Sequence, residues 1–205
     1  MQDSNNYYVI NIREFLKQGN DKEIGEDVLF QVLSDFSCPI NSDVELFLKE
    51  QSIEFTKKNQ SVTYLVFSND DLELVGYFTI AIKPITIKAE SFSNTMKRKI
   101  SRVSELDENN QMYSLSAYLI AQLGKNYTNG ANFRITGEEL LDLAIQQIKD
   151  MQYMAGGMVV FLEAENKDRL MEFYKNSNNF KQFSIRETSA KNDEIHTLNQ
   201  LLKVL

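Results

Sequence analysis

Residues 112–151 read MYSLSAYLIAQLGKNYTNGANFRITGEELLDLAIQQIKDM, a pattern of strand, loop and helix around which the other elements can be placed. Apolar residues run from Leu115 to Leu123 and predict a strand that ends at Gly124. A polar loop follows, and a helix begins at Gly137; its apolar positions have helical spacing and mark one buried face: Leu141, Ala144, Ile145, Ile148 and Met151. A strand, a loop and a helix start in this order can bind an anion, because the first N–H groups of the helix lack partners and its dipole is positive there.

The same helix start also fits a purely structural interpretation. Thr136 and Glu139 have the spacing of a capping box, in which the threonine hydroxyl accepts from the N–H of residue 139 and the carboxylate reaches back. A capped helix needs no ligand. The local pattern therefore leaves open whether the loop binds an anion or only closes the helix.

The composition indicates an ordinary globular protein. With 205 residues the chain can bury a sizeable core, and no apolar run approaches the ~20 residues that span a bilayer. The N-terminal residues lack the basic and apolar regions of a secretory signal, and the single cysteine, Cys38, cannot form an internal disulfide. We therefore expect one domain over residues 1–205, in the cytoplasm and without a membrane partner.

The scarcity of histidine and cysteine argues against metal and triad chemistry. His196 and Cys38 are the only residues of their types, too few for a conventional zinc site. A Ser-His-Asp triad would have to use His196, and no GxSxG elbow accompanies it. We expect no bound metal, and we expect Cys38 to be a buried thiol.

The charge balance bears on the partners of the protein. A net charge of −7 argues against a general nucleic-acid binder, which usually presents a basic face. Bases are concentrated at Lys97, Arg98, Lys99 and Arg102, a run that could contact RNA or the phosphates of CoA. A solvated helix face is the interpretation that we favour for this run.

The remaining chain alternates strands and helices. We predict strands at 7–12, 62–67, 73–82, 115–123, 158–163, 180–186 and 197–205, and helices at 20–36, 42–58, 137–151 and 167–175. Asn20 caps the first helix, and a Ser42–Glu45 capping box begins the second. Pro84 closes the predicted strand 73–82. The second helix should bury one face formed by Val44, Phe47, Leu48, Gln51 and Phe55.

Three stretches carry a resemblance to a known family. Phe36-Ser37-Cys38 precedes a helix that contains Glu45-Leu46-Phe47-Leu48, Leu74–Thr79 is similar to an "(I/L)VGYxT" strand, and Phe173-Tyr174-Lys175 with Asn179-Phe180 is similar to "FYxxxGF". Their order resembles that of the GNAT N-acetyltransferases, in the branch that includes toxin–antitoxin enzymes. The resemblance covers residues 25–205. It implies a single α/β domain with a mixed, mostly antiparallel central sheet flanked by helices, and with a splayed central strand.

The resemblance also implies acetyl-CoA as cosubstrate. In the family, pantetheine pairs with the splayed strand, which falls here on Gln122, Leu123, Gly124 and Lys125. The pyrophosphate loop Q/R-x-x-G-x-G/A aligns with Asn132, Phe133, Arg134, Ile135, Thr136 and Gly137. Only the last glycine is kept. Because glycines let the backbone approach phosphates, Ile135 could crowd them, and Arg134 could compensate by its charge.

Catalytic roles follow from the same resemblance. Tyr174 is the candidate acid for the leaving thiolate, with core packing as the structural alternative. Backbone N–H groups of Leu123 or Gly124 could form the oxyanion hole. Asn166 could lie near pantetheine or cap the following helix. The sequence identifies no general base, although Glu163 ends a strand and could serve.

Two functions remain open. The first is an acetyl-CoA-dependent N-acetyltransferase acting on an amine of a small metabolite, a protein or an aminoacyl-tRNA; the overall acidity argues against tRNA. The second is a GNAT-fold binding or regulatory protein that has lost activity, as the missing glycine at Ile135 would suggest. Strand edges after Phe180 could also pair two copies into a homodimer.

Overall fold

The computed structural model describes residues 6–16, 25–189 and 195–205. Their contacts divide the chain into two compact units, the first formed by Met1–Ala81 and Ala121–Gln147 and the second by Ile82–Ile120 and Ile148–Leu205. Because the contacts cluster in two units, the single domain expected from the sequence stays a prediction. The predicted cap at Asn20 lies outside the described residues.

The first unit is built on antiparallel strands. Strand β1 (Tyr7–Asn11) pairs with β2 (Val62–Ser68), which pairs with the first half of β3 (Leu74–Lys88). All three were predicted from their β-branched and aromatic residues. The register of the β2–β3 pair shifts between Val66 and Phe67, next to the Val66–Gly76 pair, and glycine inside a strand often accompanies such a bulge.

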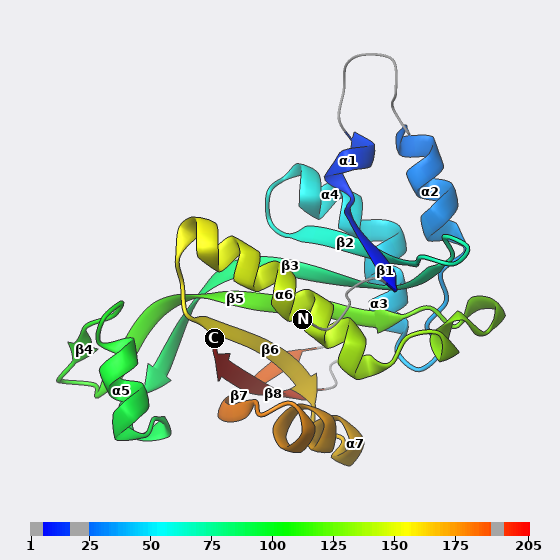
Figure 1. Ribbon diagram of the computed structural model, residues 1–205. Helices are drawn as coiled ribbons and strands as arrows, with labels where there is room; N and C mark the ends of the chain where they lie inside the picture. The colour runs from blue at the N-terminus through cyan, green and yellow to red at the C-terminus, as the bar shows by residue number, and fades with distance from the viewer. Residues whose placement is uncertain (1–5, 17–24, 190–194) are drawn as a thin grey trace. The chain divides into compact units, whose positions relative to one another are not determined.

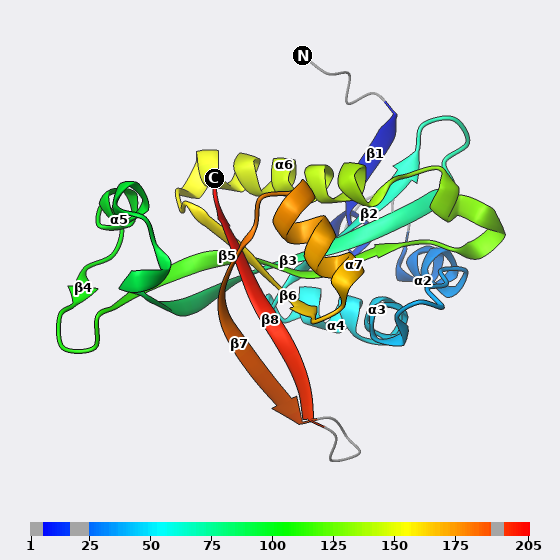
Figure 2. The same cartoon turned by 90° about the horizontal axis from the view of Figure 1, so that it is seen from below.

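Helices cover both faces of these strands. Helices α2 (Glu26–Ser34), α3 (Ser42–Leu46) and α4 (Ser52–Lys57) lie against one face, and the first half of α6 (Gly137–Ala155) lies against the other (Figures 1 and 2). The short helix α1 (Arg13–Leu16) follows β1. The core of this unit contains the fully buried side chains of Ile12, Leu29, Leu33, Phe36, Leu48, Leu65 and Tyr77.

The start of α3 differs from the prediction. Asn41, not Ser42, is the N-cap, and its side chain accepts hydrogen bonds from the N–H groups of Asp43 and Val44. The Glu45 carboxylate does not close a capping box; it accepts from the Cys38 N–H at 2.7 Å. The Ser42–Glu45 box was wrong because the amide of the preceding residue reaches the same donors.

The buried face of this helical segment also shifts along its length. The turn η1 (Phe47–Gln51) between α3 and α4 is π-helical and holds more residues than an α turn, so the phase of the side chains changes after it. Val44, Phe47 and Leu48 are buried as predicted, but Gln51 and Phe55 are exposed. The buried positions after the turn are Ser52, Ile53 and Thr56.

The second unit begins within β3. Pro84 does not end this strand, which runs on to Lys88; the proline is exposed, and an exposed position is where a strand tolerates proline. The turn η2 (Ala89–Ser91), helix α5 (Asn94–Ile100) and the short strand β4 (Leu106–Asp107) follow. Strand β4 pairs with the start of β5 (Met112–Lys125), the central strand of the sequence prediction.

The C-terminal part of this unit is a strand, a short helix and a hairpin. Strand β6 (Val159–Glu165) leads to α7 (Asp168–Met171) and to the turn η4 (Glu172–Ser177). Strands β7 (Lys181–Ser189) and β8 (Ile195–Val204) then form an antiparallel pair, whose two ribbons run side by side in Figure 2. The core here includes Ile87, Ile100, Ala117, Val159, Phe161 and Leu202.

The strands form one sheet in the order β1-β2-β3-β5-β6-β8-β7, with β4 beside β5. This mixed, mostly antiparallel sheet confirms the predicted fold class. Strand β5 pairs in parallel with β6 from Tyr118–Val160 to Ile120–Leu162, whereas β5 continues to Lys125 and β6 to Glu165. Among the described residues, this parallel ladder therefore ends before either strand does.

Candidate active site

The end of β5 is fixed by close packing at Gly124. A Cβ atom on this residue would lie 2.4 Å from Val44 Cγ1 and 3.1 Å from Tyr77 Cε1. The glycine is therefore required because α3 packs on this strand. The Tyr77 hydroxyl, buried beside it, donates to the Val44 carbonyl at 2.6 Å and ties the same helix to β3.

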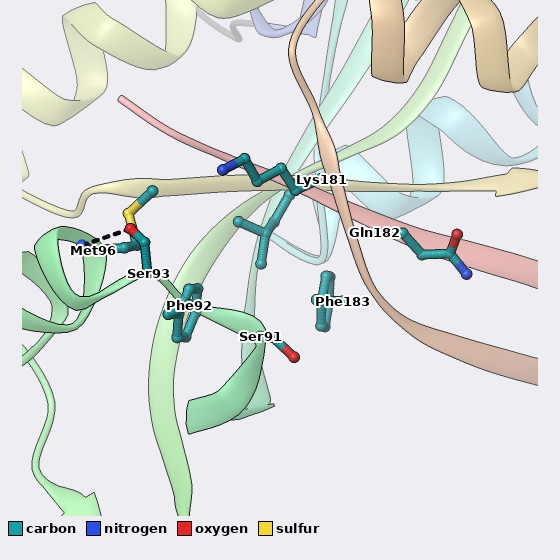
Figure 3. Close-up of a pocket in the computed structure, with 8 residues that line it drawn as sticks. Ser91, Phe92, Ser93, Met96, Lys181, Gln182 and Phe183 are labelled. Atoms are coloured by element: carbon teal, nitrogen blue, oxygen red, sulfur yellow. Dashed lines mark hydrogen bonds between the residues drawn. The ribbon is translucent and has the colours of Figure 1, made fainter.

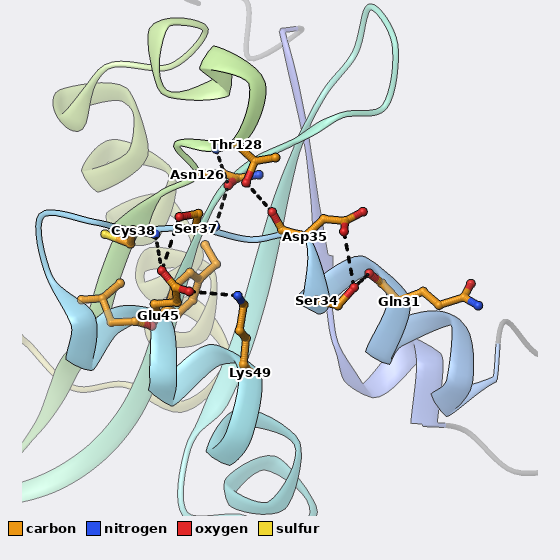
Figure 4. Close-up of polar contacts among 11 residues, drawn as sticks. Gln31, Ser34, Asp35, Ser37, Cys38, Glu45, Lys49, Asn126 and Thr128 are labelled. Carbon is orange, nitrogen blue, oxygen red and sulfur yellow. Dashed lines mark hydrogen bonds and ion pairs between the residues drawn. The ribbon is translucent and has the colours of Figure 1, made fainter.

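Immediately after β5, Asn126 joins three segments of the first unit (Figure 4). Its Oδ1 accepts from the N–H groups of Ser37 and Thr128, and its Nδ2 donates to the Leu74 carbonyl at 2.9 Å. The side chain is 4 % exposed, so these bonds form where water does not compete. Asn126 therefore ties the end of the central strand to β3 and to the segment before α3. This role was not predictable from the sequence, because a lone asparagine after a strand has no distinctive signal.

The adjacent carboxylate of Glu45 stabilises the other side of this junction. It accepts from the Cys38 N–H and from Lys49 Nζ at 2.9 Å, and these bonds hold the pKa of Glu45 below its ordinary value (Figure 4). The thiol of Cys38 is buried as predicted, and burial raises its pKa. A buried thiol with a raised pKa is a poor nucleophile.

The predicted phosphate loop runs from the end of η3 (Thr128–Phe133) to the start of α6 in the first unit. Ile135, which stands at the position of the missing glycine, has a side chain that is 1 % exposed. Its side chain points into the core, so its bulk lies on the inner side of the loop. The crowding that we expected from Ile135 therefore does not arise from its side chain at the surface.

Arg134 is engaged by the hairpin between β2 and β3. Its Nη1 donates to Asp71 Oδ2 at 2.5 Å and to Glu73 Oε2 at 2.8 Å, while Nη2 donates to Ser68 Oγ at 2.9 Å. Asp70 lies 3.8 Å away. The bonds to Asp71 and Glu73 raise the pKa of Arg134, and the bond to Arg134 lowers the pKa of Asp71. The charge that we expected to serve phosphates is thus balanced by carboxylates.

The backbone of the loop receives two further hydrogen bonds. The Tyr7 hydroxyl donates to the Arg134 carbonyl at 2.9 Å, and Lys125 Nζ donates to the Ile135 carbonyl at 2.8 Å. Lys125 and the loop, both predicted to bind the cofactor, are therefore in direct contact. Burial, followed by the nearby Glu139 carboxylate, raises the pKa of Tyr7.

The capping box at the start of α6 forms as the sequence suggested. Thr136 N–H donates to Glu139 Oε2 at 2.8 Å, and the Glu139 N–H donates to Thr136 Oγ1 at 3.1 Å. The bond from Thr136 lowers the pKa of Glu139. Helix geometry leaves the N–H groups of Gly137 and Glu138 without partners inside the helix, and these donors could meet an anion.

Other candidates in this unit differ in exposure. Gln122 and Leu123 on β5, and Asn132 and Gly137 in the loop, are half-buried. Phe133 is 89 % exposed and makes the loop surface partly apolar. The strand end and the loop thus present backbone groups, one aromatic ring and a helix start within one unit.

Tyr174 lies in the second unit, in the π-helical turn η4. Four residues separate Tyr174 from Asn179, one more than in the FYxxxGF pattern, and a π turn accommodates an additional residue. Asn179 has φ of +58°, a left-handed conformation that suits the glycine of that pattern and that asparagine tolerates. The turn therefore preserves the ends of the motif despite its extra length.

The environment of Tyr174 is aromatic. Its ring meets Phe173 edge to face at 4.9 Å between centroids and Phe180 at 6.0 Å. Burial raises the pKa of Tyr174 to about 12, so the phenol stays protonated at neutral pH. The half-buried tyrosine is thus both packed against the core and a neutral hydrogen-bond donor, as the two predicted alternatives require.

Asn166 and Glu163 follow β6 in the same unit. Asn166 does not cap α7, whose N-cap is Lys167; its Oδ1 accepts from Asn199 Nδ2 at 3.1 Å. The capping role was wrong because the helix begins one residue later. Glu163 accepts from Gln200 at 2.8 Å and from Arg186 at 3.2 Å, so this carboxylate is already partnered.

A small cavity in the second unit lies apart from these candidates in the sequence. It is lined by Ser91, Ser93 and Met96 before and within α5 and by Lys181–Phe183 of β7, and it holds no more than a water-sized space (Figure 3). The described residues contain no cluster of metal-ligating side chains. Within the described ranges no helix is long and apolar enough to cross a membrane.

The arrangement of elements is that of the GNAT acetyltransferase fold. The chain is similar to the toxin AtaT complexed with acetyl-methionyl-tRNAfMet, with a TM-score of 0.62, 15 % identity, and coverage of 97 % of this chain and 94 % of AtaT. It is equally similar to a Tyr-to-Phe variant of KacT, with a TM-score of 0.62, 16 % identity and coverage of 97 % and 95 %. AtaTR bound with AcCoA matches with a TM-score of 0.56, 14 % identity and coverage of 97 % and 93 %. No family model and no curated protein matches the sequence itself.

Proposed function

We propose that this protein is an acetyl-CoA-dependent N-acetyltransferase that transfers the acetyl group to a primary amine. The observation that carries the proposal is a GNAT fold over nearly the full length of the chain, shared with structures that include an acetyl-CoA complex. The early end of the β5–β6 ladder supports it, because β5 runs on past this ladder, and backbone groups of Gln122, Leu123 and Gly124 could bind pantetheine amides there.

The proposed reaction balances without a metal. A neutral amine attacks the thioester carbonyl, and the oxyanion is stabilised by the N–H of Leu123 or Gly124. Collapse of the intermediate breaks the C–S bond, and the amine proton passes to the CoA thiolate. Tyr174 assists by donating its phenolic hydrogen bond to the developing thiolate. Because its pKa of about 12 exceeds the ~8.5 of an ordinary thiol, the phenol keeps its own proton while this hydrogen bond stabilises the thiolate.

The location of the π turn supports this role for Tyr174, since such turns occur frequently at functional sites. Asn166 is assigned to the pantetheine end of the cofactor as a secondary proposal, now that it is free of a capping role. Gln122, Leu123, Gly124 and Lys125 are assigned to pantetheine. The loop residues Asn132, Phe133, Ile135, Thr136 and Gly137 are assigned to the pyrophosphate through their backbone.

One observation bears on the acceptor. The bases Lys97, Arg98, Lys99 and Arg102 lie on and after α5, and none of them forms an ion pair with any residue in the described part of the chain. AtaT has been solved with an acetylated methionyl-tRNA. An aminoacyl-tRNA is therefore the macromolecular acceptor to test beside small amines and protein amines. The protein's net charge of −7 still favours the smaller acceptors.

The first experiment is calorimetric titration of acetyl-CoA into the purified protein, followed by an acceptor screen with radiolabelled acetyl-CoA. Micromolar binding and acetylation of an amine support the proposal. Gly137→Trp should abolish CoA binding because its side chain would cover the helix start, whereas Tyr153→Trp, an exposed site on α6, should not. Binding without transfer to any acceptor favours the alternative, an inactive GNAT-fold binding protein. Absence of binding at millimolar acetyl-CoA rejects the enzyme.

A further inference from the structure

The phosphate loop of this chain lacks one glycine of the family pattern, at Ile135. In the family pattern, glycine allows the loop backbone to approach phosphates. Here Ile135 occupies that position, and its side chain is buried, which restricts the peptide groups on either side. Something must hold the loop in this orientation, because a branched side chain restricts the backbone but does not select one loop shape.

The restraint comes from the residue before Ile135. The Arg134 guanidinium donates hydrogen bonds to the carboxylates of Asp71 and Glu73, at 2.5 and 2.8 Å, and to the Ser68 hydroxyl. Its carbonyl is held separately by Tyr7. The side chain is 28 % exposed, so the network is partly shielded from water, and networks of this type are stronger than isolated surface pairs.

The charges near the guanidinium decide between two roles. Asp71 and Glu73 bond to it, and Asp70 lies at 3.8 Å, so the carboxylates outnumber the one positive charge. A phosphate approaching this side chain would meet net negative charge. Arg134 is therefore poorly placed electrostatically to be a phosphate ligand.

We propose that Arg134 is a positioning residue: its ion pairs with Asp71 and Glu73 clamp the phosphate loop to the β2–β3 hairpin and thereby hold the backbone N–H groups that bind the CoA pyrophosphate. The inference rests on the proposed function, since it assigns regulation of affinity at the same cofactor site. The clamp takes over the shaping role that glycine has in the family pattern.

The two roles of Arg134 give opposite results when a carboxylate is neutralised. If Arg134 bound phosphate directly, Asp71→Asn would free its charge and tighten CoA binding. If Arg134 clamps the loop, Asp71→Asn loosens the loop and weakens CoA binding, by about threefold or more. Asp70→Asn is the matched control, because it removes the same charge from an adjacent residue that is 91 % exposed and forms no short hydrogen bond to Arg134.

The experiment measures calorimetric dissociation constants of CoA and of pantetheine, which lacks the phosphates, for the wild-type protein and the variants. We expect Asp71→Asn, Glu73→Gln and Arg134→Gln to weaken CoA binding but not pantetheine binding, and Asp70→Asn to leave CoA binding unchanged or slightly tighter. Arg134→Lys should not restore full affinity, because lysine lacks the forked geometry. In the double variant Arg134→Gln/Asp71→Asn, the losses should not add, since both remove one clamp.

Two failures are distinguishable. If the wild-type protein binds CoA and Asp71→Asn binds it equally well or more tightly, the clamp is overturned while the proposed function stands. Equal loss of pantetheine binding would also overturn it, because the effect would then be general unfolding. If the wild-type protein binds neither compound, the proposed function itself fails, and the inference fails with it.

Discussion

The backbone oxygen of Gly124 lies so close to Gly76 that a Cβ atom on Gly76 would meet it at 2.9 Å. The same imagined atom would lie 3.3 Å from the Leu140 side chain of α6. On the other face, Gly124 supports Val44 of α3. The paired glycines thus let two strands and two helices approach closely at the point where the candidate cofactor residues begin.

Gly124→Ala should destabilise the protein by about 1–3 kcal/mol, because the added methyl group overlaps Val44 Cγ1 in a filled core. Chemical denaturation measures the loss. The matched test is the double variant Gly124→Ala/Val44→Ala, in which the alanine at residue 44 makes room. Val44→Ala should therefore lower the free energy of unfolding less in the Gly124→Ala variant than in the wild-type protein. Full additivity would contradict the proposed contact.

Asn126→Ala should cost about 2–4 kcal/mol of unfolding free energy, because it leaves the N–H groups of Ser37 and Thr128 without their acceptor inside the fold. Asn41→Ala provides the comparison. It removes an asparagine with the same number of N–H contacts, but at an exposed helix cap, and should cost about 1 kcal/mol. Equal losses in urea denaturation would show that burial of Asn126 has no effect.

Glu139→Gln should tighten CoA binding by about threefold to tenfold. The substitution removes a negative charge from the helix start, while the glutamine oxygen can still accept from Thr136 N–H. Glu138→Gln removes the same charge from the same turn without touching the capping box, and we expect a smaller gain. Calorimetry at low and high salt checks both, since the gain should shrink with added salt. A loss of affinity in Glu139→Gln would mean that the carboxylate shapes the loop instead.

Tyr174→Phe should lower turnover by roughly 10²-fold with little change in CoA affinity, because only the hydrogen bond to the leaving thiolate is lost. The aromatic packing with Phe173 and Phe180 remains. Tyr153→Phe, at a 94 % exposed tyrosine, should leave turnover unchanged. Unaltered turnover in Tyr174→Phe would reduce this residue to core packing.

The raised pKa of Tyr174 also predicts an alkaline effect on stability. The folded pKa is about 12 and the unfolded value is near 10, so above pH 10 the unfolded chain releases its proton first. Stability should therefore fall as the pH rises from about 10 to 12, and Tyr174→Phe should reduce this fall. Denaturation curves at alkaline pH measure the difference; parallel curves for both proteins would contradict it.

At the acidic end, Glu45 should make the opposite contribution. Its pKa is lowered in the folded protein, first by the Cys38 N–H and then by Lys49, so its stabilisation is present at neutral pH and lost as the pH falls through the folded pKa. Glu45→Gln should be less stable than the wild-type protein at pH 7, and the gap should narrow in acid. Glu50→Gln, which alters a neighbouring exposed glutamate, serves as the control.

Much of the fold was predictable because periodicity alone reports it. The helix starting at Gly137 and its buried face follow from apolar spacing, and the strands follow from β-branched and aromatic residues. The errors have local causes. The π turn Phe47–Gln51 changes which residues after it are buried, and Asn41 is the N-cap in place of Ser42. The prediction assumed a constant α-helical period and took the serine of the capping-box motif as the N-cap, and neither assumption holds in this segment.

The candidate site was less accessible from the sequence. Loop positions 132–137 could be assigned from the resemblance, but the partners of Arg134 lie more than 60 residues away, and no local pattern indicates them. The same holds for Tyr7, which reaches the loop across 127 residues. Contacts between distant segments depend on the folded backbone. The side-chain direction of Ile135 likewise became known only from its burial.

The inward-facing side chain of Ile135 has a consequence for how related chains can diverge. A chain with glycine at this position would be free to exchange the hairpin carboxylates, whereas a chain with a branched residue would need to keep them. Residue 135 should therefore co-vary with Asp71 and Glu73 among homologues, although they are distant in sequence. In such a lineage, a change of charge in a surface hairpin would alter cofactor affinity before any residue of the loop had changed.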